Sequence, residues 1–75
     1  MSFEKLQEMI ADLLDVDKEE VTPEASFQDD LGADSIDIVE LHMALEDETG
    51  LSIPDEQLLT FKKVQDVYDF IRANA

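Results

Sequence analysis

The residue in this sequence best placed for chemistry is Ser35, which stands between Asp34 and Ile36, three positions after Gly32. A serine at the start of a helix is usually only a cap. Here Gly32 allows the chain to turn sharply into the helix, and the positive end of a helix dipole favours a phosphodiester on the serine oxygen. No neighbouring base can activate the hydroxyl. We therefore interpret Ser35 as a residue that another enzyme modifies, and not as a catalytic nucleophile.

Acidic residues surround this serine and raise the question of calcium binding. They are Asp29, Asp30, Asp34, Asp37 and Glu40. Residues 29–40 have the length of an EF-hand loop with an acid at each end, but Leu31 and Ala33 occupy positions that need oxygen ligands, and Asp34 replaces the turn glycine. We predict no metal site.

An independent enzyme is a poor interpretation of the sequence. The chain has one histidine, His42, no cysteine, and no glycine-rich phosphate loop. Ser35 and His42 are two helical turns apart, too far for a direct hydrogen bond. We predict no catalytic residues.

The charge of the chain predicts which partners it can meet. Twenty acidic residues face five basic ones, for a net charge of −15, and no Lys or Arg lies between Lys18 and Lys62. Such a surface repels nucleic acids and anionic lipids and attracts proteins with basic patches. The bland alternative is that the acidity only keeps a small protein soluble. Like charge favours a monomer. No apolar run is long enough for a membrane span, and no secretory signal is visible, so we expect a cytoplasmic protein.

Apolar spacing predicts an all-α fold, a small bundle of three main helices plus one short helix, with a long first loop, in a single domain of residues 1–75. The first helix spans 3–14 with Ser2 as its N-cap, and the second spans 35–49 with Gly50 after its end. A short helical turn is expected over 55–59, with Pro54 as its first helical position. The long loop is expected to be held to the core by Val21, Phe27 and Leu31.

Each main helix carries a row of apolar residues that we expect to face the core. The rows are Phe3, Leu6, Ile10 and Leu13 in the first, Ile38, Leu41 and Leu45 in the second, with Val39 and Met43 extending that face, and Val64, Val67, Tyr68 and Ile71 in the last.

The run Asp-Leu-Gly-Ala-Asp-Ser-Ile-Asp-Ile-Val-Glu-Leu at 30–41 resembles the phosphopantetheine attachment motif of acyl carrier proteins. Residues 21–27, 43–46, 53–56 and 64–67 resemble the same family, so the resemblance covers nearly the whole chain. It implies a carrier without catalytic activity of its own. Acyl intermediates of fatty acid biosynthesis would be held as thioesters on a covalent 4'-phosphopantetheine arm derived from coenzyme A. Growing chains could lie between the helices of the core.

The resemblance also implies roles for particular residues. Ser35 would receive the arm from a phosphopantetheinyl transferase, beside the motif residues Gly32, Asp34 and Ile36. Basic patches on fatty acid synthesis enzymes and acyltransferases would meet the acids on or near the second helix, which are Asp37, Glu40, Glu46, Asp47 and Glu48. The arm would emerge above positions 39 and 42. Two alternatives remain: a carrier of a polyketide, nonribosomal or other secondary pathway, and an acidic interaction module whose serine is never modified.

Four departures from the family pattern bear on the structure. Ile36 stands where leucine is usual, and His42 where an aliphatic residue is usual; we interpret this histidine as a partly exposed residue without a special role, the alternative being a pH-sensitive group beside the arm. Residues 49–51 replace an aromatic and polar run and could reshape the exit of the second helix. Lys62 and Lys63 replace capping residues and oppose the helix dipole, so we expect Thr60 to cap the last helix and start it earlier.

The self-repulsion of the acids predicts marginal stability at low salt, because salt screens like charges and divalent cations associate loosely with acidic clusters. We expect added magnesium chloride to raise the midpoint of thermal unfolding by about 5 °C or more. The measurement is a pair of calorimetric scans with and without the salt. A midpoint that stays in place would contradict this view of the charge.

Overall fold

The computed structural model describes residues 1–74, and the described chain is helical, as predicted. Its only β-type pairing within those residues is an isolated bridge between Ser26 and Lys63. Four α-helices and one 3-10 turn follow one another along the chain: α1 (Phe3–Leu14), η1 (Lys18–Glu20), α2 (Ser35–Thr49), α3 (Asp55–Leu58) and α4 (Val64–Asn74). The predicted bundle of three main helices and one short helix is thereby confirmed.

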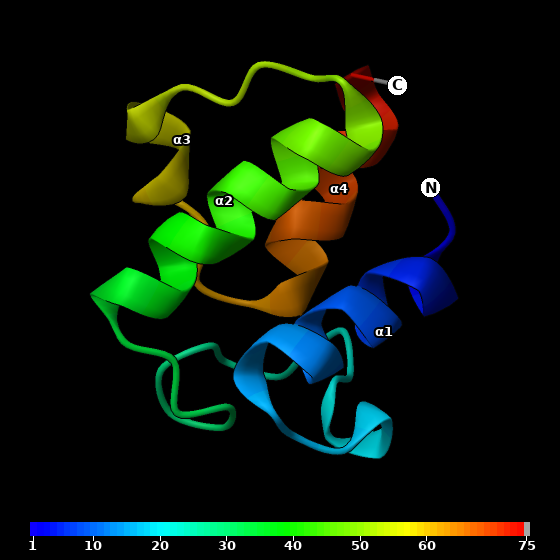
Figure 1. The fold of residues 1–75 in the computed structure, drawn as a ribbon, viewed down its shortest axis with the longest axis vertical. Coiled ribbons are helices and arrows are strands. Elements are labelled where there is room, and N and C mark those ends of the chain that lie inside the picture. Colours follow the sequence, from blue (N-terminus) through cyan, green and yellow to red (C-terminus); the bar gives the residue numbers. More distant parts are fainter. Residues whose placement is uncertain (75) are drawn as a thin grey trace.

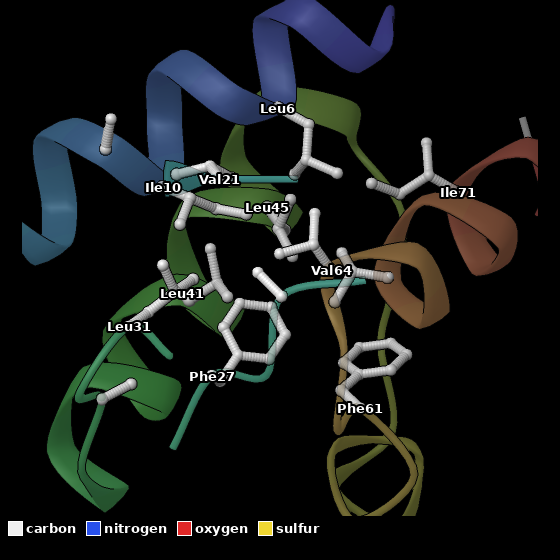
Figure 2. Close-up of a cluster of buried hydrophobic side chains, with 14 of the residues drawn as sticks. Leu6, Ile10, Val21, Phe27, Leu31, Leu41, Leu45, Phe61, Val64 and Ile71 are labelled. Carbon is white, nitrogen blue, oxygen red and sulfur yellow. The ribbon is translucent and has the colours of Figure 1, made fainter. Parts of the chain in front are cut away.

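The helices enclose one apolar core. Figure 1 shows α1 packed beside α2, α4 passing behind α2, and α3 at the edge away from α1. Side chains from α1, α2, α4 and the long connection before α2 point toward one another in Figure 2. The largest fully buried side chains are Phe27, Leu6, Ile10, Leu45, Ile71, Val21, Val64 and Val67. Each predicted row therefore contributes to the core.

The long connection between α1 and α2 is held in place by side chains and by backbone bonds. Val21, Phe27 and Leu31 are all buried, as predicted. The Phe27 amide donates to the carbonyl of Lys62 at 3.1 Å, and the Val64 amide donates to the carbonyl of Ala25 at 3.0 Å. The connection is thus tied to the chain that precedes α4, which fixes the point at which α2 begins.

Polar groups near the ends of α1 hold the first part of the chain. Ser2 Oγ accepts from the amide of Lys5 at 3.1 Å, so the predicted N-cap is confirmed. Lys18, on η1, reaches back to α1, with its Nζ 3.1 Å from Glu4 and 3.6 Å from Glu8. The hydrogen bond with Glu4 is the main cause that raises the pKa of Lys18 above its ordinary value.

The ends of α2 and α3 follow their sequence signals with one shift. Gly50 ends α2 at φ 72°, a left-handed conformation that favours glycine, as predicted. Pro54 is not the first residue of α3 but the residue before it, because its ψ of 147° is extended. The short helix consequently begins at Asp55.

The prediction that Val39 and Met43 extend the buried face of α2 is wrong. Val39 is 50% exposed and Met43 58% exposed, whereas Leu41 and Leu45 are buried. Successive residues are rotated by roughly 100° around an α-helix. Position 43 therefore lies about two such steps from Leu41, outside the sector that faces α1 and α4.

The prediction that Thr60 caps the last helix is also wrong. Thr60 Oγ1 donates to the carbonyl of Gln57 at 2.7 Å, and α4 begins only at Val64. The group that serves the start of α4 is the carboxylate of Asp66, whose Oδ2 accepts from the amides of Lys62 at 3.1 Å and Lys63 at 3.0 Å. A negative charge at this end also favours the helix dipole.

Replacing Asp66 with Ala should lower the free energy of unfolding by about 1 kcal/mol, because two amides lose their acceptor. Thr60→Ala removes a hydroxyl that serves only its own turn, and its effect should be smaller. Urea denaturation of both variants measures the difference. Equal losses, or a larger loss for Thr60→Ala, would contradict the assignment of the cap.

Candidate functional site

The start of α2 is closed by two reciprocal hydrogen bonds between neighbouring aspartates. Asp34 Oδ1 accepts from the amide of Asp37 at 2.9 Å, and Asp37 Oδ2 accepts from the amide of Asp34 at 3.1 Å. Asp34 is therefore the N-cap, with an extended backbone, and the pair forms a capping box. Two acids three residues apart are the sequence signal of such a box, although the sequence analysis did not predict it.

Ser35 is left free by this arrangement. It is the first residue of α2 and is exposed, and its side chain makes no hydrogen bond within the part of the chain that the structure describes. The hydroxyl of a serine at a helix start usually accepts a hydrogen bond from a backbone amide as the N-cap. Because Asp34 takes that task, the Ser35 hydroxyl is available to a modifying enzyme.

The loop before Ser35 is a folded turn that fixes the position of this serine relative to the core. Gly32 has φ 66°, and no atom lies within 4 Å of where its Cβ would be, so glycine is needed here for its backbone conformation and not for space. Leu31 and Ala33 on either side are each 5% exposed. The Ala33 amide donates to the carbonyl of Phe27 at 2.7 Å. The turn thus anchors the serine to the core.

Three apolar side chains form a stripe on the outer face of α2 beyond Ser35. Ile36 is 67% exposed and is followed by Val39 and Met43, also exposed. Their spacing of three and four residues places them along one side of the helix. We call these three residues the outer stripe. The exposed acids Glu40 and Asp47 lie on the same helix.

The acids predicted to contact partners differ in whether their carboxylates already make contacts within the protein. Glu40 and Asp47 are exposed. Asp37 belongs to the capping box, and Glu48 lies 3.7 Å from the Nζ of Lys5 on α1. Glu46 accepts from the amide of Ile53 at 2.7 Å. Three of the five carboxylates therefore already have contacts within the protein, and their docking role stays a prediction.

His42 is partly exposed, as the sequence predicted, but it makes two contacts that the sequence did not indicate. Its side chain is only 13% exposed. Nε2 lies 2.6 Å from the carbonyl oxygen of Ile53, so this nitrogen carries a hydrogen and donates it. The same nitrogen is 3.3 Å from Glu46 Oε2. The ring is turned toward the connection after α2, and of positions 39 and 42 Val39 is the more exposed. No sequence pattern predicts the contact between His42 and Ile53.

Other hollows lie away from Ser35. A cavity of about 250 Å³ opens at the opposite end of α2, lined by Met1, Lys5, Glu48, Thr49, Leu51 and Ile71. An open depression of about 500 Å³ lies beside Met43, Ala44, Glu46 and Asp47. Within residues 1–74 no group of three His, Cys, Asp or Glu side chains is placed to hold a metal ion. None of the helices described is both long and apolar enough to cross a membrane.

Comparison with known proteins identifies the class to which this fold and site belong. The family model described as "Phosphopantetheine attachment site" matches residues 4–71. The acyl carrier protein of Enterococcus faecalis has a solved structure with a TM-score of 0.77 to this one, at 33% identity, with both chains covered completely.

Sequence relatives are similarly named. The acyl carrier protein of Thermosynechococcus vestitus is 60% identical over 69 residues, which are 92% of this chain and 85% of that protein. That of Clostridium acetobutylicum is 51% identical over 74 residues, 99% of this chain and 96% of the other. The chain therefore belongs to the phosphopantetheine-binding acyl carrier proteins. Its cofactor is a covalently attached 4'-phosphopantetheine.

The residues present at the start of α2 fit this group. A phosphodiester needs a hydroxyl that no protein group occupies, which Ser35 offers, and an anion is favoured at a helix N-terminus. When attached, the arm supplies a thiol that holds an acyl group as a thioester. The start of α2 holds the Ser35 hydroxyl at a fixed place outside the core.

The capping box predicts effects of different size for two adjacent substitutions. Asp34→Ala removes the N-cap and should lower the free energy of unfolding by about 1 kcal/mol. Ser35→Ala should change it by only a few tenths of a kcal/mol, because an exposed hydroxyl without a partner is lost. Chemical denaturation of the two unmodified variants tests this. A loss for Ser35→Ala as large as that for Asp34→Ala would show that the serine is the cap after all.

Proposed function

We propose that Ser35 is the residue to which the 4'-phosphopantetheine arm of this carrier is attached. The observation that carries the proposal is the capping box, which takes over the N-cap and leaves an exposed hydroxyl at the first position of α2. Gly32, Asp34 and Ile36 support the site in different ways. Gly32 sets the turn, Asp34 caps the helix, and Ile36 offers an exposed apolar contact beside the serine.

The attachment requires a separate transferase. The only histidine of the chain, His42, lies two helical turns from Ser35 and is hydrogen-bonded to the carbonyl of Ile53. The titratable groups next to Ser35 are carboxylates. A general base must lie within hydrogen-bond reach of the proton that it removes. The transferase therefore has to supply the base and the coenzyme A, while this chain supplies the acceptor hydroxyl.

The partners that deliver and use acyl groups would bind α2 from outside. The outer stripe provides apolar contact area, and exposed acids such as Glu40 and Asp47 accompany it on the helix. A complementary surface is an apolar groove bordered by Lys and Arg, which would also accelerate association at low salt. Asp37, Glu46 and Glu48 would take part through the carboxylate oxygens that their internal contacts leave free.

Among acyl carriers, we assign this chain to fatty acid biosynthesis. The dense acidity of α2 supports this assignment. A carrier that docks through charge and a small apolar contact can bind many different enzymes, provided that each has a basic patch. Carriers of polyketide, nonribosomal or other secondary pathways are the alternative. The same proposal treats residues 1–75 as one carrier domain that acts as a cytoplasmic monomer and is a substrate of its partner enzymes without catalysing a reaction itself.

Incubating the unmodified protein with coenzyme A, magnesium and a broad-specificity phosphopantetheinyl transferase should add the mass of one phosphopantetheine. Ser35→Ala should gain none. Ser52→Ala is the matched control, since Ser52 is an exposed serine outside the motif, and it should be modified like the wild type. Intact-mass spectrometry reads all three.

Modification of Ser35→Ala, or a folded wild type that gains no mass, would overturn the proposal and favour an acidic interaction module. The pathway is tested next with the modified protein. Purified enzymes of fatty acid synthesis should load malonyl groups onto it and elongate them. Loading by a secondary-pathway acyltransferase alone would favour the alternative.

A further inference from the structure

The segment from Leu51 to Thr60, which contains α3, is the most loosely attached part of the structure. Its backbone hydrogen bonds join it only to itself and its immediate neighbours. α3 has no buried residue, and Leu59 after it is 79% exposed. By contrast, the long connection before α2 is tied by backbone bonds to the chain that leads into α4. A segment with few buried contacts opens at a lower free energy than its surroundings.

One residue of this segment is nevertheless held firmly from outside. Ile53 is 3% exposed, and both of its backbone polar groups bond to side chains of α2. Its amide donates to Glu46 Oε2 at 2.7 Å, and its carbonyl accepts from His42 Nε2 at 2.6 Å. Among residues 1–74, these are the hydrogen bonds that join the segment 51–60 to elements beyond its immediate neighbours.

His42 and Glu46 also support each other. They are four residues apart on α2, so they lie on the same side of the helix, with Nε2 and Oε2 3.3 Å apart. Each side chain thus restricts the other while it binds Ile53. We call His42, Glu46 and the Ile53 backbone the clamp. Loss of either side chain would leave a buried polar group of Ile53 without a partner, which is costly.

The clamp lies where the segment 51–60 meets the apolar core, because Ile53 is itself a core residue. An alkyl chain gains free energy for each methylene that leaves water, and the core of this protein consists of apolar side chains. Entry requires one wall to move, and the wall formed by the segment 51–60 is the least attached. The clamp opposes that movement where Ile53 closes the core.

We propose that His42 and Glu46 are positioning residues that control how readily an acyl chain enters and leaves the core beneath Ile53. This inference rests on the proposed function, because the chain in question is the acyl group carried on the arm at Ser35. With the clamp closed, an acyl chain inside the core is retained and its thioester is shielded from water. With the clamp broken, the segment opens more often and the chain is released.

The first test measures the clamp in the unmodified full chain by amide hydrogen exchange at Ile53. Glu46→Ala should accelerate this exchange by about 10- to 100-fold, the equivalent of one hydrogen bond to a charged acceptor. His42→Leu, which keeps an apolar side chain but removes the donor, should also accelerate it. Glu46→Gln keeps an acceptor oxygen and should restore most of the protection. Asp12→Ala, which removes an exposed charge from α1, should leave Ile53 unchanged.

The second test measures retention of the acyl chain. The same variants are loaded at Ser35 with acetyl or octanoyl phosphopantetheine, and the rate of thioester cleavage by hydroxylamine is recorded. Wild type, Glu46→Gln and Asp12→Ala should cleave octanoyl several-fold more slowly than acetyl. In Glu46→Ala and His42→Leu the octanoyl rate should rise several-fold, toward the acetyl rate, because the lost hydrogen bond lets the segment open more often, while the acetyl rate stays the same.

The outcomes separate the inference from the function on which it rests. Unchanged exchange at Ile53, an unchanged octanoyl rate in folded variants, or an equal rise for acetyl and octanoyl would each overturn the inference and leave the carrier function standing. Failure of every variant to accept an arm at Ser35 would overturn both. Circular dichroism confirms that each variant is folded before the rates are compared.

Discussion

The burial of a small apolar core holds together a chain whose surface carries a net charge of −15. All residues of the core are apolar, and no polar or charged residue is buried within residues 1–74. Every carboxylate of that part is consequently in contact with water, where repulsion between like charges is weakened by solvent and salt. With only five basic residues, ion pairs cannot balance the acids, so the fold depends on the core and on hydrogen bonds from the acids to the backbone.

The carboxylates take up backbone amides that would otherwise lack partners. Asp34 and Asp37 do this at the start of α2, Asp66 at the start of α4, and Glu46 at Ile53. A hydrogen bond to an ionised acceptor is stronger than one between neutral groups. Acidity therefore has a structural use in addition to the proposed attraction of basic partners. At α2 it has a further result, because the aspartates occupy the cap and leave the Ser35 hydroxyl without a hydrogen bond within residues 1–74, as the proposed attachment of the arm requires.

α2 combines the functions of the molecule because its apolar residues lie on two sides. Leu41 and Leu45 are buried in the core, while Val39 and Met43 face the solvent beyond Ser35. The buried side fixes the helix and leaves the exposed side open for the proposed docking of partners. His42 lies at the border of the two sides and turns toward the chain that follows the helix. A single helix thereby carries Ser35, the exposed stripe proposed for docking and the two side chains that bind Ile53.

The sequence by itself determined the all-α class, most helix boundaries and the position of Ser35 at the start of α2. These features depend on apolar spacing and on caps such as Ser2 and Gly50, which act within a few residues. Tertiary structure decided which apolar residues of α2 face outward and that His42 binds Ile53, eleven positions away. It also left Thr60 without a capping role. Such outcomes depend on how separate segments pack, because a helix face is buried only where another segment covers it.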